Sequence, residues 1–265
     1  MASTYILIDT TLIGNPSNKP WIKKRRRPSW VATLYGREAI SVTPILIDIE
    51  RAIVCNAIDP MMALVNAAHP QLGISFIETE LTLVDLKSHL QEFIYVRTED
   101  DTELTLRFAD CAVLPTLSTV LRKEQWSAIV APFKSWQIHG RDGKLKSLPI
   151  HAADGVLNSP LLLSGGQVAS FHDAMRTDQL LASLRKMRPG RPFEYSSLRA
   201  FEYANQARQI WLSAGHEEGT ELLLFARDVF DTDGRLLRHV ALNKILSQPD
   251  PVLRRKDLKR LAGLA

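Results

Sequence analysis

Two residues that could do chemistry, Arg107 and Asp110, stand three positions apart in the segment ELTLRFADCAVL, residues 103–114. The first six residues alternate as a β-strand does, which places Phe108 on one face and Arg107 on the other. Asp110 then follows the strand and could cap a helix that begins near Cys111. Arg107 cannot lose its proton, so it needs a carboxylate or carbonyl partner if it is buried. A ligand site and a structural ion pair both remain open, and we favour the structural role because no base or nucleophile accompanies these residues.

The second chemical feature is WIKKRRRPSW at residues 21–30, where five consecutive cations lie between two tryptophans. Residues 19–37 hold seven lysines and arginines and no acid, so the rest of the chain is net acidic although the whole carries +4. Such a segment could be a solvated loop, or could bind an acidic protein surface, anionic lipid or nucleic acid. Its candidate partner-binding residues are Trp21, Lys23, Lys24, Arg25, Arg26, Arg27 and Trp30.

Motifs for catalysis, metal binding and phosphate binding are absent from the sequence. The seven histidines form neither HExxH nor a pair with a nearby cysteine, and Cys55 and Cys111 lie far apart. The pair Gly165-Gly166 completes no phosphate-binding or nucleophile-elbow pattern. We therefore predict no catalytic residues, no metal and no cofactor.

The elements that must position Arg107 and Asp110 are short apolar strands between helices. The capping box at Thr82-Leu83-Val84-Asp85 predicts the start of one helix, and another should end before Pro70. The turn at 98–102 joins two strands that should pair antiparallel in a mixed sheet. The predicted strands are 5–9, 45–49, 73–78, 92–97, 103–108 and 133–139.

The remainder of the chain has a helical pattern. Residues 141–170 collect Gly, Pro, Ser and Asp without a sustained period, which predicts a linker between an α/β domain at 1–140 and a helical domain at 171–265. The predicted fold class is thus α+β, a mixed α/β N-terminal domain followed by an all-helical C-terminal domain. Tyr195, Tyr203 and Trp211 are further candidate partner-binding residues.

Composition indicates a soluble globular protein. Hydrophobic residues make up 45% of 265 residues, enough for one large or two medium domains. Two distant cysteines, no secretion signal and no apolar run of about 18 residues favour a cytoplasmic protein without membrane insertion.

Several segments, taken in order, resemble one known family. They are the YILID strand, Thr43-Pro44-Ile45-Leu46, the helix carrying His89-Leu90, the RFAD motif at 107–110 and the closing Ala131-Pro132-Phe133 with Trp136. This order is similar to that of the type VI secretion effector adaptors, or effector chaperones, whose shared domain is called DUF4123. The resemblance covers about residues 5–140, and the chain departs from the family at Ala109 and Cys111-Ala112 and in its basic insertion at 19–30.

The resemblance implies a non-enzymatic bacterial adaptor that binds a cognate secreted effector in the cytoplasm and helps to load it onto the VgrG spike. The alternative is a nucleic-acid-binding protein that uses the basic segment 19–30 and the C-terminal VLRRKDLKR, although no nucleic-acid-binding fold motif is present. An enzyme whose residues converge only in three dimensions is a third possibility.

Overall fold

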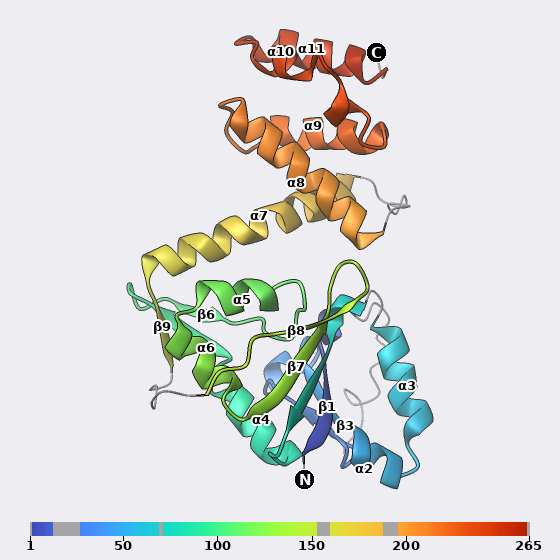
Figure 1. Ribbon diagram of the computed structural model, residues 1–265, viewed down its shortest axis with the longest axis vertical. Helices are drawn as coiled ribbons and strands as arrows, with labels where there is room; N and C mark the ends of the chain where they lie inside the picture. The colour runs from blue at the N-terminus through green and yellow to red at the C-terminus, as the bar shows by residue number, and fades with distance from the viewer. Residues whose placement is uncertain (1, 13–26, 69–70, 153–159, 188–195, 264–265) are drawn as a thin grey trace. The chain divides into compact units, whose positions relative to one another are not determined.

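The computed structural model describes residues 2–12, 27–68, 71–152, 160–187 and 196–263. It divides into two compact units, Met1–Asp173 and Ala174–Ala265 (Figure 1). The chain is a mixed α+β protein, with the strands in the first unit and several helices in the second.

The first unit is built on a six-stranded sheet of order β2-β3-β1-β4-β7-β8, in which every neighbouring pair is antiparallel. The mixed sheet predicted from the alternation of strands and helices is therefore wrong for this sheet. An apolar run indicates that both faces of a strand are buried, but it does not distinguish parallel from antiparallel pairing with the neighbouring strand. The strands are β1 (Ser3–Ile8), β2 (Val31–Thr33), β3 (Ile45–Asp48), β4 (Ile74–Thr79), β7 (Phe133–His139) and β8 (Leu145–Ser147).

Helices cover both faces of this sheet, which explains why the run Tyr5–Ile8 of β1 is apolar on both faces. In β1, Tyr5 and Leu7 belong to one core cluster, and Ile6 and Ile8 belong to another on the opposite face. The helices α2 (Ile49–Val54) and α3 (Ile58–Ala67) pack on the second cluster, and α4 (Leu83–Gln91), α5 (Leu114–Val120) and α6 (Lys123–Val130) pack on the first. Figure 1 shows α2 and α3 on one side of the sheet and α4 to α6 on the other.

Local signals placed several of these helices correctly. Thr82 caps α4, because its hydroxyl accepts a hydrogen bond from the Asp85 amide at 3.3 Å. The helix predicted to begin near Cys111 is in fact two helices, α5 and α6, because the backbone is extended at Leu121 between them.

A second, three-stranded sheet lies in the same unit, in the order β6-β5-β9. Its strands are β5 (Tyr95–Thr98), β6 (Glu103–Thr105) and β9 (Leu161–Leu163). The predicted antiparallel pairing of the two strands around the turn at 98–102 is confirmed, with Tyr95 opposite Thr105, whereas β9 pairs with β5 in parallel. This sheet is the mixed one.

The segment predicted as a linker, residues 141–170, contains regular structure. It holds β8, β9 and the start of α7 (Gly165–Met187), and the boundary between the units falls within α7, after Asp173. Strands of three residues are too short to show a period, so composition alone marked this stretch as irregular.

The second unit is helical, as predicted. Ser196 caps α8 (Ser197–Ser213) and Asp250 caps α11 (Pro251–Leu261), while α9 (Thr220–Asp231), a 3₁₀ turn at Leu236–Arg238 and α10 (Leu242–Leu246) lie between them. A single core cluster unites these elements, with Trp211 stacked on Phe225 at 5.7 Å between ring centroids. Among the described residues, no helix combines the length and apolar character needed to cross a bilayer.

Candidate functional site

Arg107 pairs with a residue that the sequence analysis did not identify, Asp9 at the end of β1. The Arg107 Nη2 lies 3.0 Å from Asp9 Oδ2 and donates a second, longer bond of 3.3 Å to the Thr11 hydroxyl. Asp9 Oδ1 accepts hydrogen bonds from the Thr11 amide at 2.9 Å and the Thr11 hydroxyl at 2.6 Å. The contact therefore ties the end of β1 to the turn that follows β6, 98 residues along the chain.

In this ion pair the aspartate is buried and the arginine is half-exposed. The Asp9 side chain is 4% exposed and the Arg107 side chain 48%. Burial by itself would lower the pKa of Arg107, but the negative charges of Asp9 and Asp110 outweigh it and raise that pKa above its ordinary value. This geometry supports the structural role for Arg107 while leaving part of its guanidinium open to solvent.

Asp110 does not cap a helix in the way the sequence suggested. Helix α5 begins at Leu114, and its N-cap residue, Val113, makes no side-chain cap bond. Asp110 Oδ1 instead accepts from the Ala112 amide at 2.9 Å, which closes a local turn, and its Oδ2 lies 3.5 Å from Arg107 Nη2. The third residue of the motif, Phe108, is 2% exposed and packs in the core.

The loop between β2 and β3 forms the facing wall of the site. Thr43 is fully buried, and its hydroxyl accepts from the Tyr35 amide at 2.7 Å while its carbonyl accepts from the Thr10 hydroxyl at 2.7 Å. These two bonds hold the loop against the end of β1. They fix the position of Tyr35, whose ring is half-buried.

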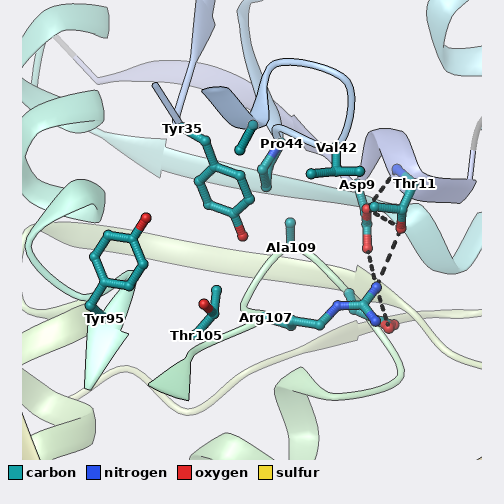
Figure 2. A pocket seen from close by; sticks show the side chains of 11 residues that line it. Asp9, Thr11, Tyr35, Val42, Pro44, Tyr95, Thr105, Arg107 and Ala109 are labelled. Carbon is teal, nitrogen blue, oxygen red and sulfur yellow. Dashed lines mark hydrogen bonds and ion pairs between the residues drawn. The ribbon is translucent and has the colours of Figure 1, made fainter. Parts of the chain in front are cut away.

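Between this loop and the three-stranded sheet lies a pocket of about 400 Å³. That volume is within the range of about 300 to 1,000 Å³ usual for ligand sites. Figure 2 shows the rings of Tyr35 and Tyr95 towards one end of it and the Arg107 guanidinium, beside Asp9 and Thr11, towards the other. The described residues that line it are Asp9, Thr11, Tyr35, Ala39, Val42, Pro44, Tyr95, Thr105, Arg107, Ala109 and Asp110.

The titratable groups of the described lining are two aspartates, two tyrosines and one arginine. Burial, and then the charge of Asp9, raise the pKa of Tyr35, so its hydroxyl stays protonated at neutral pH. The described lining contains no histidine, cysteine, serine or lysine that could act as nucleophile or base. Cys111, nearby in sequence, is buried, which raises its thiol pKa to about 12. No group of three or more His, Cys, Asp or Glu among the described residues could hold a metal ion.

Most candidates in the basic segment lie outside the described residues: Trp21, Lys23, Lys24, Arg25 and Arg26. Arg27 is described and exposed, and its guanidinium donates to the Thr33 hydroxyl. Trp30 is 6% exposed and packs in the core cluster of α2 and α3, so it is not available as a surface anchor.

In the second unit, Tyr195 lies outside the described residues, and Tyr203 and Trp211 are buried core residues. The Tyr203 hydroxyl donates to the Asp233 carbonyl at 3.0 Å, and the Trp211 indole N–H donates to the Glu217 carbonyl at 2.8 Å. Both polar groups are therefore satisfied within the unit. Tyr203 and Trp211 are therefore not available as surface anchors, because their helical spacing places them on the core side.

In the C-terminal basic stretch, two arginines form ion pairs within the second unit and three cations are exposed. Arg254 bonds Glu221 at 2.5 Å, and Arg255 pairs with the fully buried Asp228. Lys256, Lys259 and Arg260 are exposed on α11. Two of the five cations thus hold helices together.

Comparison with known families finds a match for the part of the chain that carries the pocket. Residues 4–128 match the model of a family described as Domain of unknown function (DUF4123), a range that runs from β1 into α6. The match supports the assignment of this domain to the DUF4123 family, and every described residue that lines the pocket falls inside it. Searches of curated proteins and of solved structures find no match.

Proposed function

We propose that this chain is a non-enzymatic adaptor of a bacterial type VI secretion system, which binds a cognate effector in the cytoplasm and promotes its loading onto the VgrG spike. The proposal depends on the match of residues 4–128 to DUF4123. The same stretch contains most of the segments whose order along the chain resembles that of the effector adaptors. Its partners would be one secreted effector and the spike protein.

The site chemistry supports a binding role. The pocket holds two tyrosine hydroxyls, an apolar wall and one arginine, Arg107. Both carboxylates of its described lining, Asp9 and Asp110, lie within ion-pair distance of that arginine. The helical second unit lies beyond the matched residues, so it is the part of the chain in which specificity for one effector could differ between adaptors.

The test is affinity purification of the tagged chain from its native host at moderate salt, with nuclease treatment, followed by mass identification of the bound proteins. The proposal predicts recovery of one large effector, with or without the spike protein. Recovery of ribosomal or chromosomal proteins alone would contradict it.

The alternative, binding of nucleic acid, is favoured by the exposed Arg27 beside the run of cations at 23–26 and by the exposed cations of α11. It predicts affinity for DNA or RNA that falls steeply with salt, since each phosphate contact releases counterions. Replacing Lys23, Lys24, Arg25 and Arg26 by glutamine would abolish that affinity and, under the adaptor proposal, leave effector recovery within about twofold, a margin of less than ~0.5 kcal/mol.

A further inference from the structure

The strand that borders the pocket, β6, is an edge strand whose outer side has no partner among the described residues. It pairs only with β5 in the order β6-β5-β9. The Leu106 amide donates to the Ile94 carbonyl at 2.8 Å and the Thr98 amide to the Thr102 carbonyl at 3.0 Å. Because hydrogen-bonded pairs alternate in an antiparallel ladder, Leu104 also faces β5, and the main-chain groups of Glu103 and Thr105 point away from it.

At the opposite edge of this sheet, a side chain hydrogen-bonds the main chain of β9. On β9, the Leu162 carbonyl accepts a hydrogen bond of 2.7 Å from the Gln125 side chain, which occupies that edge. No such side-chain bond reaches the main chain of Glu103 or Thr105 from the described residues. Unpaired strand edges are templates for an additional strand, so β6 is the edge of this sheet open to one.

The pocket lies directly beside this open edge. Thr105 lines the pocket with its side chain, and Tyr95, directly opposite it across the ladder, is 47% exposed and lines it too. Beyond β6, the Nε and Nη1 of Arg107 have no partner among the described residues, since its contacts with Asp9, Thr11 and Asp110 all use Nη2. One continuous surface therefore offers main-chain groups, a slot between tyrosines and unused guanidinium N–H donors.

The charges in the pocket restrict what can occupy it. One arginine stands against two aspartates, so the formal charge of the described lining is negative. The apolar wall of Val42, Pro44 and Ala109 suits an uncharged side chain. A carboxylate would meet the existing carboxylates, whereas a main-chain carbonyl can accept from Arg107 without that repulsion.

We infer that β6 and this pocket bind an extended segment of a partner protein, which adds a strand to β6 and inserts one aromatic or aliphatic side chain between Tyr35 and Tyr95. Main-chain hydrogen bonds to Glu103 and Thr105 supply affinity, and the slot supplies specificity. The inference rests on the proposed function only for the source of the segment, which would be the effector.

A selection from a displayed library of random 12-residue peptides, made against the full chain, tests this without knowledge of the partner. Selected peptides should share an aromatic or aliphatic anchor residue, with Asp and Glu depleted at that position. The Thr105→Pro variant removes an outward N–H, and Tyr95→Ala opens the slot; each should weaken binding of a selected peptide at least ~tenfold.

Matched controls exist on the edge strand β8. Ser147→Pro removes a main-chain N–H that points away from β7, because Leu148 and Lys146 make the bonds to that strand. Leu145→Ala removes a side chain that is 53% exposed, close to the 47% of Tyr95. Both controls should bind the peptide within about twofold of the unmodified chain.

Hydrogen exchange on the unmodified chain gives a readout that does not depend on how the variants fold. With a selected peptide bound, the amides of Glu103 and Thr105 should gain protection while Leu145 and Ser147 do not change. A selection without binders, unprotected β6 amides, or equal loss in the β8 controls would overturn the inference. If Thr105→Pro and Tyr95→Ala still capture the effector, the strand-addition inference is wrong and the adaptor proposal stands. If the chain binds a selected peptide at β6 but captures no effector, the inference stands and the adaptor proposal is wrong.

Discussion

The ion pair between Asp9 and Arg107 should contribute measurably to the stability of the first unit. Exposed pairs contribute ~0.2 to 1 kcal/mol, whereas breaking a buried pair by removing one partner costs ~3 to 5 kcal/mol. With side chains 4% and 48% exposed, this pair lies between those limits. We expect a coupling energy of ~1 to 2 kcal/mol between the two residues.

A double-mutant cycle of Asp9→Asn and Arg107→Met measures this coupling. Asparagine keeps the oxygen that accepts from Thr11, so the cycle isolates the contact with Arg107. Because the chain has two units, urea unfolding should be followed by pulsed hydrogen exchange on peptides from Ser3–Ile8, which report the first unit alone.

The control cycle uses Arg97 and Asp101, an i,i+4 pair at 2.9 Å whose side chains are 51% and 79% exposed. Arg97→Met and Asp101→Asn should show a coupling below ~0.5 kcal/mol. If the coupling between Asp9 and Arg107 is no larger than this control, their ion pair does not stabilise the fold and the reasoning is refuted.

Two further predictions concern single residues. In the native protein at pH 8 a thiol reagent should label the exposed Cys55 and leave Cys111 unmodified, because burial raises the pKa of Cys111 to about 12; denaturant should expose both, and two labels without denaturant would contradict this burial. Gly234→Ala should destabilise the second unit by ~2 to 4 kcal/mol, because it has φ +70° and a Cβ there would lie 2.5 Å from the Tyr203 ring. Gly215→Ala, with φ +81° and open space, should cost only ~1 to 2 kcal/mol, and equal losses in thermal unfolding would show that the close approach is unimportant.

The sequence predicted those parts of the fold that depend on local signals. Strand β7 begins and ends as predicted, and Thr82 caps α4 as predicted. The direction of the strands in the main sheet was not accessible, because burial on both faces produces the same apolar run in parallel and antiparallel sheets. Strands β8 and β9 are too short for a period and were missed.

The site could be predicted only in part. Arg107 requires an acidic partner by its chemistry, but Asp9 lies 98 residues away and no local pattern connects them. One signal was present, since Asp9 directly follows the buried run of β1, where an acid is costly unless it is paired. The tyrosines of the pocket were not identified because the loop around Thr43, held by buried hydrogen bonds, positions Tyr35. Trp30 and Trp211 were expected at the surface but are buried, because large aromatic side chains are highly buried on average.

The most direct test of the adaptor proposal is a comparison of the proteins secreted by the native host with and without this gene. The account predicts that deletion removes one large effector from the secreted fraction while other effectors are still delivered, and that the unmodified gene restores it. An unchanged set of secreted proteins, or the loss of all effectors together, would contradict the claim that this chain loads one cognate effector.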